Sequence, residues 1–183
     1  MKIKELTSLL AIVAFLAVGC HTEPTPDTPN KPEPTPTDGV AFTANYFDCE
    51  YYGDYYWTGT DNWTVYLYED TENLNGAYLM LDILCDPAAD DIAGTYTADP
   101  WGDCDTAYTY IPGYVSGEDM WGSWYVDMLG GDINEDLAPI FDGEFTIDID
   151  ANGVYTFTFD CLDDADHAIT GSIKATMDSE ATT

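Results

Sequence analysis

Alternation of apolar and polar residues with a period of two constrains the fold of this chain more than any other feature. The stretch Asn62–Glu69 places Trp63, Val65 and Leu67 on one side, and Ala77–Leu84 repeats the pattern. Alternate side chains of a β-strand share one face, whereas a helical period of 3.6 residues is not sustained here. The sequence therefore predicts an all-β domain.

A β-hairpin is predicted in the C-terminal third. Phe145–Asp150 and Tyr155–Asp160 both alternate, and Asn152-Gly153 separates them. Asn-Gly favours a type I′ turn because both central residues then take positive φ. Other strand candidates are Ala41–Phe47, Gly94–Ala98, Ala107–Val115, Gly122–Leu129 and Ile169–Met177.

These candidates make an antiparallel meander of about eight or nine strands. Such a meander must protect its edge strands from pairing with other chains. Closure into an up-and-down, lipocalin-like barrel removes the edges, and this architecture is favoured. A two-sheet β-sandwich is the alternative.

The charge balance excludes several classes of function. The chain has 35 acidic residues against 4 basic ones, all lysines, and its net charge is −31. Five acids and three lysines precede Val40, which leaves 30 acids against Lys174 in residues 40–183. No nucleic-acid partner is expected, because phosphate binding needs clustered Lys or Arg. The aromatic content of 14% is too high for a disordered acidic chain.

The first residues have the pattern of an export signal. Residues 1–19 combine an early pair of lysines with a short apolar run that ends in small residues. Leu16–Cys20 resembles the lipobox of bacterial lipoproteins. That resemblance implies that residues 1–19 are a signal peptide and that Cys20 carries the lipid anchor. Two acyl chains give stable attachment to a membrane.

Residues 20–39 follow as a tether. Six of the ten prolines lie between Pro24 and Pro36, in a segment without apolar pattern, and such segments are stiff and extended. The proline- and threonine-rich tether resembles those of Bacteroidetes outer-membrane lipoproteins. The resemblance implies an outer-membrane, cell-surface location. The alternation and the acid count place an acidic β domain after the tether, over residues 40–183.

The domain itself is similar to small uncharacterised β domains of Bacteroidetes lipoproteins. Its Gly94-Thr-Tyr-Thr strand and the segment from Asp163 to Ile173 carry this resemblance, which spans most of residues 40–177. It implies a fold and a location but brings no catalytic motif.

Four cysteines remain in the domain: Cys49, Cys85, Cys104 and Cys161. An oxidising envelope permits disulfides, and four cysteines allow three pairings. Cys85 and Cys161 continue the apolar parity of their strands and are expected to point inward, where they could also stay as buried thiols. Cys49 and Cys104 are expected in polar loops.

No enzyme and no cofactor are expected. His167 is the domain's histidine, and it lacks a Gly-x-Ser-x-Gly elbow that would present a nucleophile. Calcium is possible at the acidic loop of Asp160, Asp163, Asp164 and Asp166, and the alternative is a merely solvated loop. The segments Asp148–Gly153 and Asp86–Asp91 are weaker candidates.

Loop aromatics are the main functional signal. Trp57, Trp101 and Trp121 each lie close to glycine, and Tyr55 and Asp61 flank the first of them. Aromatic faces over carboxylates suit sugar rings. We expect a surface-anchored binding module for a glycan or peptide, which could serve a TonB-dependent uptake complex. The alternative is a structural lipoprotein that contacts another envelope protein and buries these side chains.

Asp105-Thr106-Ala107 resembles the three-residue pattern at which Bacteroidetes O-glycosylate exported proteins. The resemblance implies a glycan on Thr106. The alternative is an unmodified threonine at the start of a strand.

Overall fold

The computed structural model describes residues 39–69, 75–99 and 101–177. These residues form β-strands and connecting loops without any helix, which confirms the prediction of an all-β domain. The thirteen strands are β1 (Val40–Ala41), β2 (Tyr46–Gly53), β3 (Asp61–Tyr68), β4 (Gly76–Cys85), β5 (Gly94–Ala98), β6 (Thr109–Tyr110), β7 (Tyr114–Ser116), β8 (Asp119–Trp121), β9 (Trp124–Leu129), β10 (Asp132–Pro139), β11 (Asp142–Ile149), β12 (Tyr155–Leu162) and β13 (Ala168–Met177).

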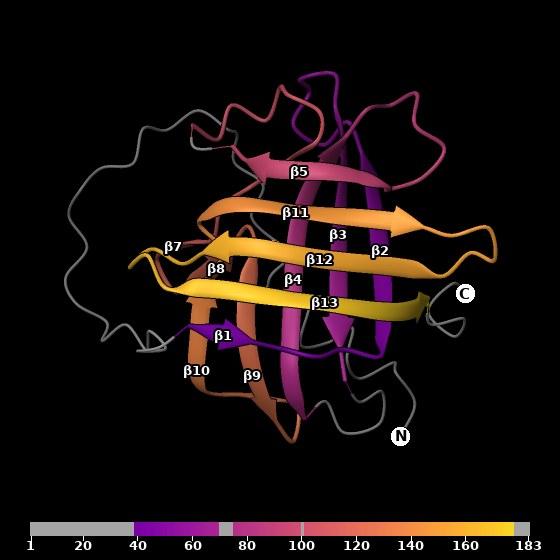
Figure 1. Cartoon of the computed structure of the whole chain (residues 1–183). Coiled ribbons are helices and arrows are strands. Elements are labelled where there is room, and N and C mark those ends of the chain that lie inside the picture. The colour runs from indigo at the N-terminus through magenta and orange to yellow at the C-terminus, as the bar shows by residue number, and fades with distance from the viewer. Residues whose placement is uncertain (1–38, 70–74, 100, 178–183) are drawn as a thin grey trace.

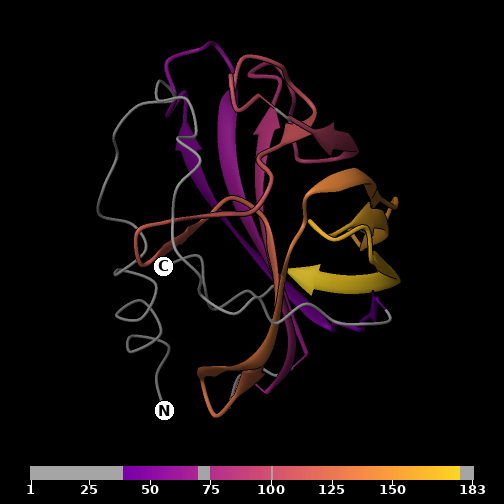
Figure 2. The same cartoon turned by 90° about the vertical axis from the view of Figure 1, so that its left-hand side faces the viewer.

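The strands build two layers that cross one another. In Figure 1, β11, β12 and β13 run across β2, β3, β4, β9 and β10, which lie behind them. Figure 2 shows the same layers from the side, with the β7–β8 hairpin on the far side of the rear layer. The aromatic core lies between the two layers.

Hydrogen-bond pairing shows that the two layers belong to one curled sheet. Its strand order is β10-β9-β4-β3-β2-β13-β12-β11-β5-β6, and β6 also pairs with β4. The β2–β13 and β5–β6 contacts are parallel. The order therefore departs from a simple up-and-down meander, in which every neighbouring pair would be antiparallel.

At strand β4, neighbouring strands of the sheet are no longer consecutive in the chain, because β4 pairs with both β9 and β6. Its first half, Gly76–Met80, pairs with β9, while Ile83 and Leu84 pair with β6. A strand of ten residues is long enough to hold two different neighbours on one edge. As a result, β9 and β10 extend the rear layer while β6 joins it to the front one.

The predicted hairpin is confirmed, but its turn is not of type I′. Strand β11 ends at Ile149 and β12 begins at Tyr155, so residues 150–154 connect them. Only Gly153 has positive φ there, at 77°. The Asp150 carboxylate accepts backbone N–H bonds from Asn152 at 2.7 Å and from Val154, and these bonds favour the longer loop.

The interior is filled by aromatic rings. Phe145 is fully buried, and its ring centroid lies 5.2 Å from those of Tyr96 and Phe159 and 5.3 Å from that of Tyr110. Offset and tilted rings at these spacings pack favourably. The space between the layers is thus occupied by side chains of the chain itself.

The outward face of the rear layer carries a second apolar cluster. Trp124, Val126 and Met128 alternate with the inward Tyr125, and Met120 of β8 packs against them. The β7–β8 hairpin thus lies against this outward face and makes a small third layer there.

Candidate functional site

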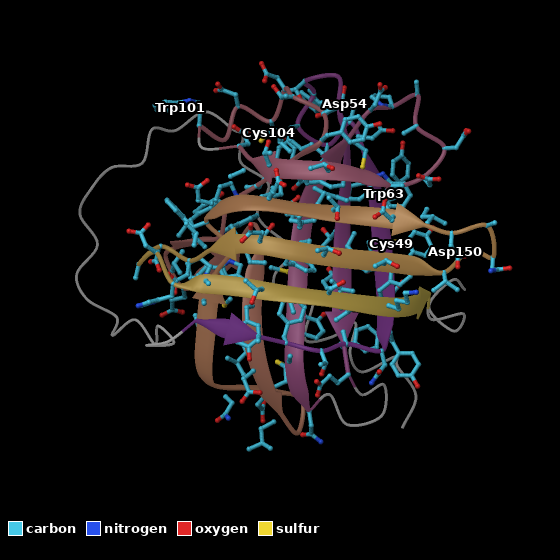
Figure 3. All side chains as sticks on the ribbon, in the orientation of Figure 1. Cys49, Asp54, Trp63, Trp101, Cys104 and Asp150 are labelled. Atoms are coloured by element: carbon cyan, nitrogen blue, oxygen red, sulfur yellow. The ribbon has the colours of Figure 1, made fainter. Side chains whose placement is uncertain are left out.

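Two loops at one end of the molecule carry the most exposed aromatic side chains. Trp57, between β2 and β3, is 90% exposed, and Trp101, between β5 and β6, is 84% exposed. Figure 3 shows Trp101, Cys104 and Asp54 at this end, beyond β5. We call these loops, residues 54–60 and 101–108, the rim.

Asp54 shapes the first rim loop. Its Oδ1 accepts the backbone N–H of Thr58 at 2.9 Å and of Gly59 at 3.2 Å. Within this turn Trp57 has φ 59°, a region that non-glycine residues rarely adopt. The carboxylate thus stabilises the tight turn that presents the Trp57 indole to solvent.

Asp99 does the same for the second loop. This buried carboxylate accepts N–H bonds from Trp101 at 3.3 Å, from Gly102 at 3.1 Å and from Cys104 at 2.9 Å. Three bonds to one side chain define the path of the loop around Trp101.

The two loops are joined into one unit. The hydroxyls of Thr58 and Thr60 both donate to the Cys104 carbonyl, the latter at 2.8 Å. Beneath them Leu84, Cys104 and Ile111 form a small buried cluster with Tyr56. Because the loops share hydrogen bonds and a small core, the backbone segments that carry Trp57 and Trp101 are fixed relative to each other.

The structure brings Tyr55 and Asp61 close to the same loops. Tyr55 is 39% exposed, and its ring meets Tyr56 edge-on at 5.0 Å. Asp61 accepts the Tyr51 hydroxyl at 2.8 Å, and this hydrogen bond raises the pKa of Tyr51.

Trp121 does not join the rim. It lies in strand β8 rather than in a loop, which corrects its predicted placement. Its backbone carbonyl accepts the Trp124 indole N–H at 2.7 Å. Figures 1 and 2 show the β7–β8 hairpin well apart from the rim.

Sequence reasoning missed a polar network below the Trp57 loop. Asp82 accepts a hydrogen bond from the Asn62 amide at 2.6 Å and one from the Tyr56 hydroxyl at 3.4 Å. Burial raises the pKa of Asp82 to about 6, although both hydrogen bonds oppose the shift. The signal was present, because Asp82 stands between Met80 and Leu84 on an otherwise apolar strand face.

The predicted calcium loop uses its central carboxylate internally. Asp163 is buried, and its oxygens accept the backbone N–H groups of Ala165 and His167 at 2.8 Å and contact His167 Nδ1 at 3.1 Å. Asp160, Asp164 and Asp166 are exposed. Within residues 39–69, 75–99 and 101–177, no three acidic, histidine or cysteine side chains gather as a metal site.

Among the described residues, the structure joins none of the four domain cysteines in a disulfide. Cys85 and Cys161 point inward as predicted, and burial raises the pKa of Cys85 to about 11 and that of Cys161 to about 12. Cys49 lies in β2 rather than in a loop, which corrects its predicted placement. Cys104 lies in a loop, as predicted, and is buried there.

Thr106 lies exposed in the second rim loop, where its hydroxyl donates to Asp105 at 3.0 Å. Cys20 and the tether lie outside the described residues.

No protein-family model, curated protein or solved structure matches the chain. In the part of the chain that the structure describes, no helix has the length and apolarity needed to cross a bilayer.

Proposed function

We propose that this chain is a surface-anchored, non-catalytic lipoprotein whose rim binds a glycan. The observation that carries the proposal is the pair of indoles, Trp57 and Trp101, held 90% and 84% exposed on two loops that are hydrogen-bonded together. Larger exposed apolar patches mark interaction sites and ligand grooves in soluble proteins, and two exposed indoles on joined loops supply apolar surface of that kind. Flat aromatic faces stack against the C–H faces of sugar rings, and nearby carboxylates accept hydroxyl protons.

The proposal includes a lipocalin-like barrel as the finer description of the curled sheet. Eight strands pair in a ring through the β4–β6 and β2–β13 contacts, which supports it. Such a barrel can hold a ligand inside, but here Phe145 and its aromatic neighbours fill the interior. The ligand is therefore assigned to the rim.

The non-catalytic part of the proposal is supported by the role of His167. Its Nδ1 contacts Asp163 within the β12–β13 turn, and its backbone N–H bonds the same carboxylate. His167 and Asp163 thus stabilise the turn together, and this structural role accounts for the histidine without a catalytic one.

The anchor and the partner are parts of the same proposal. A lipid on Cys20 and the proline-rich tether would hold the rim above the outer membrane at the cell surface. There it could pass glycans to a TonB-dependent transporter.

A second function, contact with another envelope protein, is favoured by a different surface. Tyr46, Tyr68 and Tyr78 lie in register across β2, β3 and β4 on the outward face of the rear layer. Their ring centroids are 6.1 and 6.3 Å apart, and Tyr46 is 37% exposed. Rows of tyrosine are common in protein interfaces.

The test is glycan binding by the full-length protein in neutral detergent. A panel of neutral oligosaccharides is screened, and the affinity of any that bind is measured by calorimetry. Trp57→Ala and Trp101→Ala should each weaken binding by about 10-fold, which corresponds to the loss of one stacking contact. Tyr114→Ala removes an aromatic side chain that is 51% exposed in β7, apart from the rim, and is the matched control. Unchanged affinity in the Trp57→Ala, Trp101→Ala double variant would overturn the proposal.

The proposal extends to a glycan carried by Thr106. Its exposed hydroxyl in the second rim loop is accessible to a transferase. The intact mass of protein from its own host should exceed that of the lipidated polypeptide, and Thr106→Ala should remove the excess. A mass excess that survives in the variant would reject the site.

A further inference from the structure

In the part of the chain that the structure describes, the rim carries acidic residues and no basic one. Asp54 and Asp99 shape its loops, and Asp103 and Asp105 are exposed beside Trp101. Among described residues the only lysine or arginine is Lys174, which lies in β13.

Lys174 is distant from the rim. It pairs with Thr156 at the start of β12, next to the 150–154 turn. The pKa of Asp150 in that turn is lowered by the backbone N–H groups of Val154 and Asn152 and, to a smaller extent, by Lys174. Figure 3 places Asp150 at the opposite side of the molecule from Trp101.

This distribution of charge acts on a ligand stacked on the indoles. An anionic sugar would meet several carboxylates with no cation to offset them, whereas a neutral sugar meets no opposing charge. An ammonium group gains from the carboxylates and also from the face of an indole, since cations are attracted to aromatic rings.

We infer that the rim selects a polymer of amino sugars with free, protonated amines. The inference rests on the proposed glycan-binding function and names its ligand class. A sugar is favoured over a basic peptide because extended peptides pair with a sheet edge or enter a groove. Here the exposed groups are separate flat indoles on irregular loops.

The experiment compares two hexamers of the same sugar backbone, one with free, charged amines and one with neutral, N-acetylated amines. A β-1,4-linked glucosamine hexamer and its fully N-acetylated form are titrated into the full-length protein at about pH 5.5, where the free amines of the sugar are protonated. The amine form should bind about 10-fold more tightly. That ratio should shrink toward one as salt rises from about 20 mM to about 0.5 M, because salt screens charge interactions between exposed groups.

Each result separates this inference from the proposed function. Equal affinity for the two hexamers would overturn the selection for charge but leave the proposed glycan binding intact. Binding of other neutral glycans, with neither hexamer bound, would have the same meaning. A lysine hexamer that binds as tightly as the amino sugar overturns the sugar assignment. If no glycan of any charge binds, the proposed function falls with it.

Substitutions of acidic residues test which carboxylates favour the amine form of the hexamer. The Asp103→Asn, Asp105→Asn double variant should reduce the affinity ratio by about 3-fold, in line with the modest energies of exposed charge pairs. Asp148→Asn, an exposed acid on β11, is the matched control and should leave the ratio unchanged. A ratio that is the same in both variants would contradict the assignment to the rim.

Discussion

At the scale of single residues, Asp82 has the most consequential environment. It lies on the outward face of β4, hydrogen-bonded to Asn62 and Tyr56, and burial raises its pKa to about 6 from an ordinary 3.8. Below about pH 4 the carboxyl is protonated in both folded and unfolded chains. Between about pH 4 and 6 the Asp82 carboxyl loses its proton in the unfolded chain but keeps it in the folded one. The contribution of Asp82 to the free energy of unfolding therefore falls as the pH rises. Above about pH 6 the full penalty, about 3 kcal/mol, is present.

Asp82→Asn should therefore raise the free energy of unfolding by about 1–3 kcal/mol at pH 7.5 and change it little near pH 4. The asparagine stays neutral and can still bond Asn62 and Tyr56. Urea unfolding from pH 4 to pH 8 measures the difference between variant and native chain. Asp148→Asn, which replaces an exposed acid, is the control for the general loss of one charge. A variant that is less stable than the native chain at pH 7.5 would contradict the assigned pKa shift.

At the scale of elements, the link between the rim loops is the feature to test. Thr60 is buried, and its hydroxyl donates to the Cys104 carbonyl across the two loops. Thr60→Val keeps the shape of the side chain but leaves that carbonyl with one donor fewer. We expect it to lower the free energy of unfolding by about 1–2 kcal/mol. It should also weaken glycan binding, because Trp57 and Trp101 are then less firmly placed.

The control for Thr60→Val is an exposed threonine of a regular strand. Thr158→Val removes a 3.3 Å hydroxyl contact with Ser172 on the surface of β12 and β13. It should change stability by less than about 0.5 kcal/mol. If the two substitutions lower the free energy of unfolding equally, the hydrogen bond between the rim loops does not stabilise the domain more than a surface contact does.

Elements with clean alternation were predictable from the sequence. The β3, β4, β11 and β12 strands, the hairpin joining the last two, and the inward direction of Cys85 and Cys161 all follow from a period of two. Strand β10 was missed because its acidic run, Asp132–Asp136, hides the pattern. Cys49 was misplaced for a similar reason, since the acids Asp48 and Glu50 flank it inside β2.

Pairing between distant strands was not predictable. The parallel contact of β13 with β2 and the sharing of β4 by β9 and β6 depend on how the sheet curls, which no local pattern encodes. The sequence predicted individual rim residues but not that the two rim loops lie together. Trp57, Trp101, Tyr55 and Asp61 were named from their neighbours, but nothing in the sequence shows that Cys104 joins their loops.

At the scale of the whole molecule, charge dominates. Residues 40–183 hold 30 acids and one lysine, so the folded chain repels itself. Calcium and magnesium at equal ionic strength should raise the melting temperature by the same amount. This follows because Asp163 already accepts backbone N–H bonds within its own turn. A calorimetric scan with each cation checks it, and a larger shift with calcium would point to a specific site.

The anchor is also a property of the whole chain. Cys20→Ala should release the protein from membranes into the soluble fraction, because a lipid on this cysteine is the proposed attachment. Fractionation and acyl labelling of the native and variant proteins measure this. Retention of the variant on the membrane with unchanged labelling would refute the lipobox interpretation.

The parallel contact between β2 and β13 has a consequence for how the domain matures. Tyr46 and Phe47, early in the domain, pair with Thr176 and Met177 at the far end of β13. Contacts so remote in sequence make folding slow, since a long loop must close before they form. The sheet therefore cannot join at this seam until the final strand has been synthesised. If the chain is exported as proposed, this delay gives it more time to pass the translocation channel before the seam closes.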